Sequence, residues 1–256
     1  MHPLGFTWKV SSRDSLRTFL SSCEPYTSKI VSRLAPRINT FICVGANRGW
    51  YPMLVRSRNT SCKIYAFECN SAIHHELYEN IEANKANVEL VKKAVGASCG
   101  SSLLYLPSGG NEGMSTLFPQ LSTKSPASEV EKVEVINLDS YFQNQNSKLG
   151  QVVMLIDIEG GELNALRGSV KLLSTYSPLL ILEINEKMLE AAGSSAYDLL
   201  TFLADMGYFV YWIDEREKLH LVDHLNKLPH TNVLPIDTGS NYLCTKNTEF
   251  IENFRF

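Results

Sequence analysis

The residues that decide the fold of this chain are Phe41-Ile42-Cys43-Val44-Gly45-Ala46-Asn47-Arg48-Gly49-Trp50. The stretch begins as an apolar run typical of a buried strand, breaks into small residues and then continues with helical character. Small side chains at Gly45, Ala46 and Gly49 let the backbone turn tightly and let a small molecule approach its N–H groups. The positive end of the following helix would face any anion held there. The stretch therefore predicts a strand, a ligand-binding turn and a helix.

A second signal is an acidic residue about 20 positions after the glycines. Residues 62–67 form another apolar run, which ends directly before Glu68. In nucleotide-binding α/β units, an acid in this place binds the hydroxyl groups of a ribose. We therefore expect Glu68 to bind the ribose of a nucleoside-containing cofactor.

Size and composition are those of an ordinary globular protein. The chain has 256 residues, of which 44% are hydrophobic and 20% are charged, and its formal net charge is −3. Such a weak net charge attracts neither nucleic acid nor an anionic membrane by itself. We therefore expect no nucleic-acid partner and no membrane partner.

The cysteines and the N-terminus bear on the cellular compartment. None of the six cysteines forms a C-x-x-C pair, and several lie in apolar runs as small hydrophobic residues. The first residues lack the apolar core of a signal peptide, and no later stretch has the roughly 18 apolar residues of a membrane span. These features favour reduced thiols and a cytoplasmic location.

Strand and helix patterns alternate after an N-terminal helical extension, which we assign to residues 1–36. Strands are expected at 39–44, 62–67, 88–95, 151–158, 179–184, 208–213 and 241–245. Helices are expected at 49–58, at 71–85 with Ser71 as N-cap, from a first turn at Glu162 to about 173, and at 195–206. The alternation predicts one α/β domain over residues 37–256 with a mostly parallel sheet.

Residues 96–132 interrupt this regularity with Gly, Ser, Pro and Asn and contain only a short alternating run at 102–106. Connections of this length in compact domains are usually functional. We expect this loop to help shape a substrate pocket.

Polar residues follow several of the expected strands. They are Gly45 and Asn47, then Glu68, then Asp157 and Glu159, and finally Glu183. Because the carboxyl ends of parallel strands meet at one crevice, and because ligands bind there in open α/β sheets, we expect these residues to form one site.

The sequence resembles the FkbM-type S-adenosylmethionine-dependent methyltransferases. The resemblance rests on a series of motifs in order along residues 38–185: the "VGAN-x-G-x-Y" signature at 44–51, Ala66-Phe67-Glu68 with Asn70, Lys93-Ala94-Val95-Gly96, Leu138-Asp139-Ser140-Tyr141, Asp157-Ile158-Glu159-Gly160 with Glu162, and Leu182-Glu183-Ile184-Asn185.

The resemblance implies a Rossmann-like class I methyltransferase fold: a seven-stranded, mostly parallel sheet with an antiparallel last strand and helices on both faces. It implies S-adenosyl-L-methionine as cofactor and methyl transfer to a hydroxyl group of a sugar or related small molecule. The implied cofactor-binding residues are Gly45, Ala46, Asn47 and Gly49 at the turn, Glu68 at the ribose, Val95 at the adenine, and Asp157 between cofactor and acceptor.

Two positions depart from the family pattern. The position before Val44 is usually an acid in this family and is Cys43 here, and a lysine often found two residues before the "D-x-E-G" aspartate is replaced by Leu155.

Methyl transfer from a sulfonium is an in-line displacement, so the protein must chiefly align the acceptor oxygen with the methyl carbon. The acceptor hydroxyl must also lose its proton, and a carboxylate or a divalent metal held by several carboxylates can assist. We take Asp157, Glu159 and Glu183 as the candidate catalytic residues. We assign no metal site, and we interpret the pair His220 and His224 as surface residues.

Two other functions are compatible with a strand, a turn and a helix. The first is a nicotinamide-dinucleotide oxidoreductase, which shares the later acid, although its fingerprint requires glycine where this chain has Asn47 and Trp50. The second is a non-catalytic interaction protein with a methyltransferase fold. The departures at Cys43 and Leu155 favour this alternative.

Overall fold

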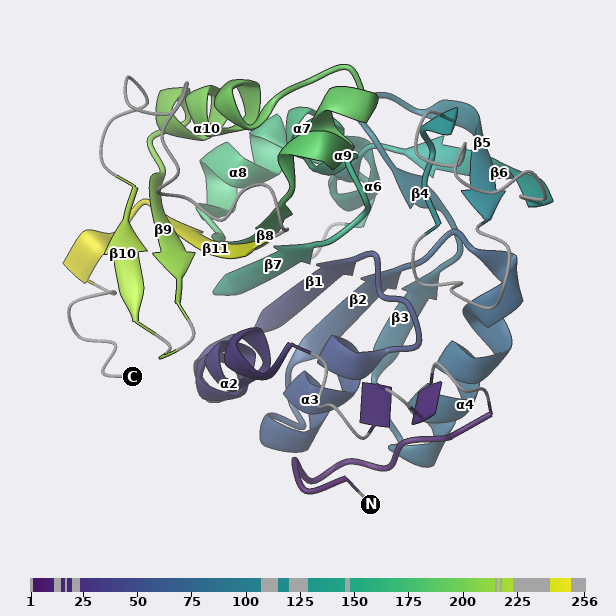
Figure 1. Ribbon diagram of the computed structural model, residues 1–256. Coiled ribbons are helices and arrows are strands. Elements are labelled where there is room, and N and C mark those ends of the chain that lie inside the picture. The colour runs from purple at the N-terminus through teal and green to yellow at the C-terminus, as the bar shows by residue number, and fades with distance from the viewer. Residues whose placement is uncertain are drawn as a thin grey trace.

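The computed structural model describes residues 2–11, 15–16, 18–19, 24–106, 115–119, 129–145, 148–214, 216, 218–222 and 240–249. Its described strands form an eight-stranded central sheet and a smaller three-stranded sheet (Figure 1). The central sheet has the order β10 (Leu219–Leu221), β9 (Phe209–Ile213), β11 (Ser240–Thr245), β8 (Leu179–Ile184), β7 (Val152–Ile156), β1 (Thr40–Val44), β2 (Lys63–Phe67) and β3 (Val88–Val91).

The middle of the central sheet is parallel and fully buried. Strand β1 pairs in parallel with both β2 and β7, and every residue of β1 and β7 is buried. Continuous apolar sequence is what a strand covered on both faces requires. The last strand, β11, runs antiparallel to β8 and β9, which confirms the expected antiparallel last strand.

The expected number of seven strands is wrong by one. The additional strand, β10, has three residues and pairs antiparallel with the edge strand β9. A strand this short, with two of its three residues exposed, carries too little alternation to be recognised from sequence.

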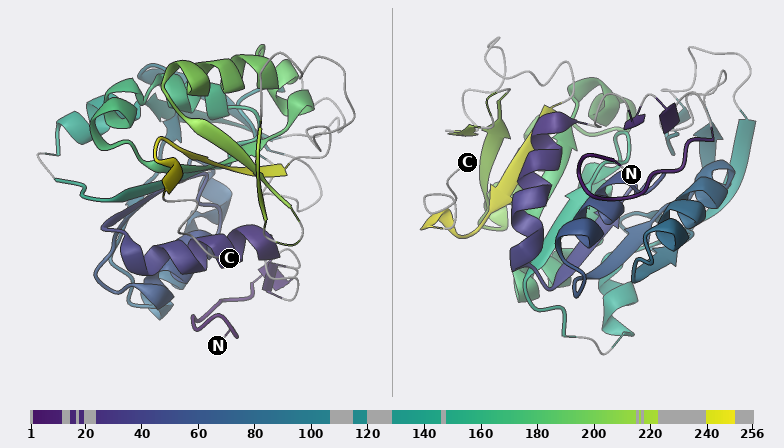
Figure 2. Two further views of the ribbon diagram at one scale, coloured as in Figure 1. Left: turned by 90° about the vertical axis from the view of Figure 1, so that its left-hand side faces the viewer. Right: turned by 90° about the horizontal axis from the view of Figure 1, so that it is seen from below.

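Helices cover both faces of the sheet (Figures 1 and 2). One face carries α2 (Pro25–Leu34), followed by the 3₁₀ helix η1 (Ala35–Arg37), α3 (Trp50–Arg58) and α4 (His74–Ala83). The other face carries α6 (Leu138–Gln143), α7 (Glu162–Arg167), α8 (Val170–Tyr176), α9 (Glu186–Ala191) and α10 (Ala196–Asp205). Among the described helices, none has the length and apolar character needed to cross a membrane.

The N-terminal segment packs onto the face that carries α3, as the right-hand view of Figure 2 shows. Phe6 and Trp8 are buried and meet the Trp50 ring edge-to-face. The indole N–H of Trp50 donates a 2.8 Å hydrogen bond to the hydroxyl of Ser28 in α2. The segment thus contributes to the hydrophobic core, while a domain boundary at residue 36 stays a prediction.

The single strand expected at 88–95 is wrong. It divides into β3 and β4 (Ala94–Val95), which belong to different sheets. Strand β4 pairs in parallel with β6 (Glu129–Ile136), and β6 pairs antiparallel with β5 (Gly100–Leu106). The region expected to be a loop at 96–132 therefore contains a strand and the start of another. The alternation of Val and Glu in β6 was the available signal.

Two helix expectations also need correction. The helix expected to run from Glu162 to about 173 is divided into α7 and α8 around Gly168, where an added Cβ would lie 2.1 Å from the Gly96 carbonyl oxygen. The helix expected from Ser71 begins with a 3₁₀ turn, η2 (Ser71–Ile73), before α4. Its N-cap is Asn70 rather than Ser71, since the Asn70 side chain accepts the Ala72 N–H at 3.0 Å.

Candidate functional site

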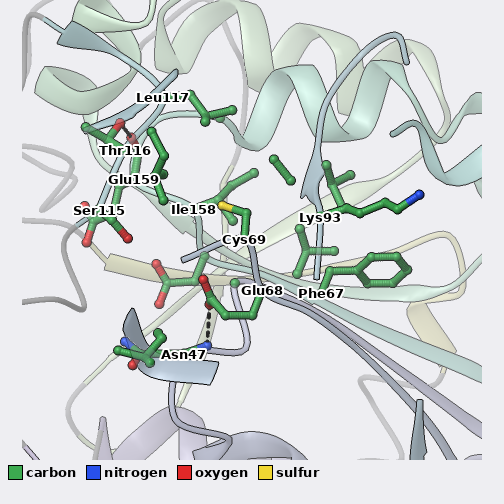
Figure 3. A pocket seen from close by; sticks show the side chains of 18 of the residues that line it. Asn47, Phe67, Glu68, Cys69, Lys93, Ser115, Thr116, Leu117, Ile158 and Glu159 are labelled. Atoms are coloured by element: carbon green, nitrogen blue, oxygen red, sulfur yellow. Dashed lines mark hydrogen bonds between the residues drawn. The ribbon is translucent and has the colours of Figure 1, made fainter. Parts of the chain in front are cut away.

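A cavity of about 700 Å³, including its open mouth, lies at the carboxyl ends of β1, β2, β4 and β7 (Figure 3). It is lined by Val44, Gly45, Asn47, Phe67, Glu68, Cys69, Ile73, Lys93, Ala94, Val95, Leu104, Ser115, Thr116, Leu117, Phe118, Asp157, Ile158, Glu159 and Gly161. The expected crevice at the strand ends is therefore a real cavity, and the small second sheet supplies one of its walls through β4 and β5.

The turn after β1 requires glycine at Gly45. This residue has a φ of +83°, and an added Cβ would lie 1.8 Å from the carbonyl oxygen of Asp157. The backbones of the two strand ends are also joined by a 3.0 Å hydrogen bond from the Asp157 N–H to the Val44 carbonyl. The small residue thus brings the turn and the Asp157 backbone into contact.

The N–H groups of this turn are bound inside the protein. Those of Gly45 and Ala46 both donate to the carbonyl of Phe67 at 3.0 Å. Those of the next three residues, Asn47, Arg48 and Gly49, donate to the Glu68 carboxylate, the Asn47 side chain and the Ala46 carbonyl. The expectation that these N–H groups face a small molecule is therefore wrong, and the turn is no cradle for a phosphate.

Glu68 joins the ends of β1 and β2. One carboxylate oxygen accepts the Asn47 N–H at 2.7 Å, drawn as a dashed line in Figure 3, and the other accepts the Asn70 N–H at 2.8 Å. Burial raises the pKa of Glu68, and the backbone hydrogen bonds from Asn70 and Asn47 oppose that rise. The Cys69 N–H is a third backbone donor to this carboxylate. Each carboxylate oxygen has two lone pairs, so Glu68 retains acceptor capacity for a hydroxyl group that enters the cavity.

Three further carboxylates gather beside this cavity. Oxygen atoms of Asp157, Glu159 and Glu183 lie within 4.8 Å of one another. Asp157 and Glu159 line the cavity, whereas Glu183 does not line it and shares a hydrogen bond with Asp157. The separation would let the three oxygens coordinate one cation, a geometry that the sequence did not lead us to assign.

The mutual repulsion of these acids changes their protonation. Burial, followed by the charges of Glu183 and Glu24, raises the pKa of Asp157 well above its usual range. Burial and the Asp157 charge raise the pKa of Glu159 to about 8. Burial raises the pKa of Glu183 to about 7, against the lowering effect of its hydrogen bond with Asp157. The hydrogen bond between them raises the pKa of Asp157 and lowers that of Glu183, so the two carboxyl groups titrate as a pair.

The loop that carries Asp157 and Glu159 is fixed from within by Glu162. The Glu162 carboxylate accepts the N–H groups of Ile158 and Gly160 at 3.1 and 3.2 Å. Glu159 itself has a φ of +52°, a left-handed conformation that side chains seldom adopt. Glu162 thus shapes the loop, and the strained backbone at Glu159 sets where its carboxylate lies.

Sequence reasoning missed Glu24, which belongs to the N-terminal segment. Its carboxylate accepts a hydrogen bond from the hydroxyl of Tyr51, the last residue of the glycine-rich signature, and another from Asn241 in β11. Its charge raises the pKa of Asp157 and Glu159. No local motif marks Glu24, and only its tertiary contacts with two distant segments reveal it.

The expected cofactor-binding residues divide into two groups. Gly45, Asn47, Glu68, Val95 and Asp157 line the cavity. Ala46 and Gly49 do not line it. Ala46 is buried in the core on the α3 side of the sheet, and Gly49 faces Leu77 of α4. Leu104 and Ser115–Phe118 form a further wall of the cavity, and both lie in the region 96–132 that was expected to help shape a pocket.

The two departures from the family pattern are neighbours. Cys43 and Leu155 lie directly opposite each other in the parallel register of β1 and β7. Both are buried in the core on the α3 side of the sheet and neither lines the cavity. An acid and a lysine at these two positions would form a buried ion pair, and replacing both together by apolar residues leaves no unpaired charge.

His220 does not form a metal site within the described residues. Its ring nitrogen lies 2.8 Å from the carboxylate of Asp214, and His224 falls outside the described residues.

Comparison with known proteins identifies the family. Residues 44–210, more than half of the chain, match the family model of the methyltransferase FkbM domain. No curated protein sequence matches the chain.

Several solved methyltransferases align with the structure. A methyltransferase FkbM from Methylobacillus flagellatus KT aligns with a TM-score of 0.48 and 14% identity over 92% of this chain, which spans 56% of that protein. An O-methyltransferase from Bacillus cereus in complex with SAH has a TM-score of 0.48 and 11% identity over 92% of this chain and 91% of its own. A SAM-dependent O-methyltransferase from Thermotoga maritima has a TM-score of 0.43 and 11% identity over 94% of this chain and 67% of its own. On the strength of the sequence match across the turn, Glu68 and the Asp157 loop, this chain belongs to the FkbM methyltransferase family.

Proposed function

We propose that the chain is an S-adenosylmethionine-dependent O-methyltransferase that acts on a hydroxyl group of a sugar or related small molecule. The observation that carries the proposal is that Glu68 and the turn at Gly45 line the same cavity as Asp157 and Glu159. A ribose-binding acid, a tight turn and a carboxylate cluster are thus available to a single bound molecule and its reaction partner.

The residues of the cavity suit S-adenosylmethionine. Glu68 retains acceptor capacity for a hydroxyl group of the ribose beside its backbone hydrogen bonds. Apolar side chains of Val95, Leu104 and Ile73 offer a surface for the adenine. Because the N–H groups of the turn are already used, the site does not suit the pyrophosphate of a dinucleotide, which needs such donors.

The chemistry that S-adenosylmethionine supplies is a methyl group on a sulfonium, which is transferred as the C–S bond breaks and a C–O bond forms. The part of the protein would be to hold the acceptor oxygen in position for attack on the methyl carbon. Glu159 and the Asp157–Glu183 pair are the groups available to accept the hydroxyl proton. A carboxylate with a pKa near neutrality is suited to this role, because it is both ionised and basic enough.

The charges around the site favour a neutral acceptor. Asp157, Glu159, Glu183 and Glu24 lie close enough to perturb one another's pKa. The described cation on the cavity wall, Lys93, forms a 2.6 Å ion pair with Glu134. A phosphorylated or carboxylated acceptor would meet net repulsion here, whereas the hydroxyl groups of a sugar can donate to the carboxylates.

The first experiment asks what the protein binds. We expect mass spectrometry of protein purified under native conditions to detect S-adenosylmethionine or S-adenosylhomocysteine, and calorimetry of the ligand-free protein to give saturable binding of S-adenosylhomocysteine. A bound nicotinamide nucleotide, or no binding of either sulfur compound, would refute the proposal.

The second experiment addresses the acceptor. Transfer of a radiolabelled methyl group is measured against a panel of neutral sugars, sugar phosphates and uronic acids. We expect turnover with neutral hydroxyl compounds. Cofactor binding together with turnover only of anionic compounds would retain the methyltransferase and reject the acceptor class.

A further inference from the structure

Residues Ser115–Phe118 form one wall of the cofactor cavity, and we refer to them as the strap. All four residues line the cavity, although their place in the sequence lies between β5 and β6 of the small sheet. In Figure 3, Ser115, Thr116 and Leu117 lie on the side of the cavity where Glu159 is found, and Lys93 and Phe67 lie on the opposite side. The strap therefore faces the space that the cofactor would fill.

The strap is fixed to the Asp157 loop through Thr116. The Thr116 hydroxyl donates a 3.0 Å hydrogen bond to the backbone carbonyl of Glu159 and accepts the N–H of Phe118 at 3.3 Å. Thr116 is only 4% exposed, so this hydroxyl is a buried polar group whose partners matter. The contact joins the strap to the residue with the strained backbone in the carboxylate cluster.

Two further contacts fix the strap elsewhere. Thr116 pairs with Tyr105 of β5 through two backbone hydrogen bonds of 2.8 and 3.2 Å. The side-chain amide of Asn70 approaches the Ser115 hydroxyl at 3.4 Å, and the Asn70 N–H binds Glu68. The strap is thereby linked to the ribose-binding acid as well as to the carboxylate cluster.

We propose that Thr116 is a positioning residue that holds the strap against the Asp157 loop, as a wall of the cofactor cavity, and so slows release of the cofactor. The inference rests on the proposed function, because it takes S-adenosylmethionine as the occupant of the cavity. Tyr105 attaches the strap to the small sheet, and among the described residues the Thr116 hydroxyl and the Ser115 hydroxyl join it by hydrogen bonds to the two halves of the site. Without the Thr116 bond, the arrangement in which the strap is bound to the Glu159 carbonyl is less populated. The apparent affinity for the cofactor falls in proportion to that population.

The test measures binding of S-adenosylhomocysteine by calorimetry and its dissociation rate by displacement. Thr116→Val keeps the size and branching of the side chain and removes the hydroxyl. We expect it to weaken affinity about 3- to 10-fold, mainly through faster release, which is the range for loss of one hydrogen bond. Thr116→Ser retains the hydroxyl and with it the hydrogen bond. We therefore expect its affinity to stay within about twofold of that of the unmodified protein.

Thr40→Val is the matched control. Thr40 is also buried, and its hydroxyl donates a 2.6 Å hydrogen bond to a backbone carbonyl, that of Leu149, at the start of β1 and away from the cavity. We expect Thr40→Val to lower the melting temperature while leaving release of S-adenosylhomocysteine unchanged. If it accelerates release as much as Thr116→Val does, the effect reports general destabilisation and the proposal is wrong.

A second variant guards against a Thr116→Val protein that fails to fold. Ser115→Ala loses the Asn70 contact without leaving a buried hydroxyl. We expect it to release S-adenosylhomocysteine faster than the unmodified protein, as Thr116→Val does. Unchanged release in whichever of the two variants folds overturns the role of the strap, provided that the unmodified protein binds S-adenosylhomocysteine. Absence of binding in the unmodified protein instead refutes the proposed function.

Discussion

The backbone N–H of Asn47 donates a 2.7 Å hydrogen bond to the carboxylate of Glu68. This bond joins the turn after β1 to the acid after β2, two motifs that lie 21 residues apart in the sequence. Glu68 therefore has a structural task in addition to its proposed contact with the ribose. Experiments on variants at this position must therefore measure protein stability and cofactor affinity separately.

Replacing Glu68 tests the ribose contact. We expect Glu68→Ala to weaken binding of S-adenosylmethionine by about 1.5–3 kcal/mol, the range for hydrogen bonds to a charged group. Calorimetry measures the affinity, and thermal unfolding measures the stability lost by leaving the Asn47 and Asn70 N–H groups without an acceptor. Glu68→Gln, which keeps one acceptor oxygen, should lose less stability. Unchanged affinity in the alanine variant would remove the ribose assignment.

Replacing Asp157 tests the catalytic cluster. We expect Asp157→Asn to lower the methylation rate more than the cofactor affinity, because the hydrogen bond and charge of the Asp157–Glu183 pair would act near the reacting oxygen. Single-turnover kinetics and calorimetry on the same preparation separate the two quantities. Turnover at the level of the unmodified protein, with any acceptor that it methylates, would show that Asp157 has no catalytic role.

The raised pKa values of the acids predict how stability depends on pH. Glu159 and Glu183 bind protons with pKa values of about 8 and 7 in the folded protein, against about 4.3 for an ordinary glutamate. Between these limits the folded state holds more protons than the unfolded state, so the contribution of these groups to stability decreases as pH rises from about 4.3 to about 8.

Thermal unfolding across this pH range checks the sign. We expect Glu183→Gln to flatten the decrease, because it removes one of the repelling charges. Glu134→Gln alters an exposed ion pair with Lys93 and should leave the slope unchanged. A slope that is identical in the Glu183→Gln variant and in the unmodified protein would contradict titration of the two carboxyl groups as a pair.

Adding a methyl group at Gly45 tests the close contact between the turn and the Asp157 backbone. The added Cβ of Gly45→Ala would lie 1.8 Å from a backbone oxygen, so we expect a loss of about 4 kcal/mol or more in unfolding free energy, together with loss of cofactor binding. Gly193 has a similar φ of +78° with nothing near an added Cβ. Gly193→Ala should therefore cost only about 1 kcal/mol, the penalty for the left-handed backbone alone. Equal losses in the two variants would mean that the contact at Gly45 has no special importance.

The Cys43 and Leu155 pair can be tested by restoring charge. Cys43→Asp or Leu155→Lys alone should destabilise the protein by about 3–5 kcal/mol, because each buries an unpaired charge. The double variant should recover part of that loss, with a coupling free energy of about 0.5–3 kcal/mol. Denaturant unfolding of the four proteins gives the cycle. Strict additivity of the two losses would show that the neighbouring positions do not interact.

Local sequence was sufficient for the centre of the fold. The apolar runs at β1, β2, β7 and β8 are buried on both faces, so their composition alone marks them as central parallel strands. The resemblance to the FkbM family then gave the antiparallel last strand. The short edge strand β10 was missed, and β3 and β4 were joined into one strand. Both features depend on which strand pairs with which, and local sequence does not show that.

The site was predictable to the same extent. A strand end reveals where Glu68, Asp157 and Glu159 emerge, since parallel strands bring their carboxyl ends to one edge. The sequence could not indicate that the N–H groups of the turn are all bound internally, or that Ala46 faces the core rather than the cavity. Those facts depend on how the turn packs against β2.

What the sequence by itself determined is the list of chemical groups at the strand ends, because burial of apolar runs fixes where a chain leaves a parallel sheet. What only the tertiary structure decided is which residues lie beside these groups: Glu24 beside the carboxylate cluster, and Thr116 bound to Glu159. Hydrogen bonds and charges act over a few ångströms of space, whatever the separation along the chain, so contacts between segments this distant leave no local pattern to read.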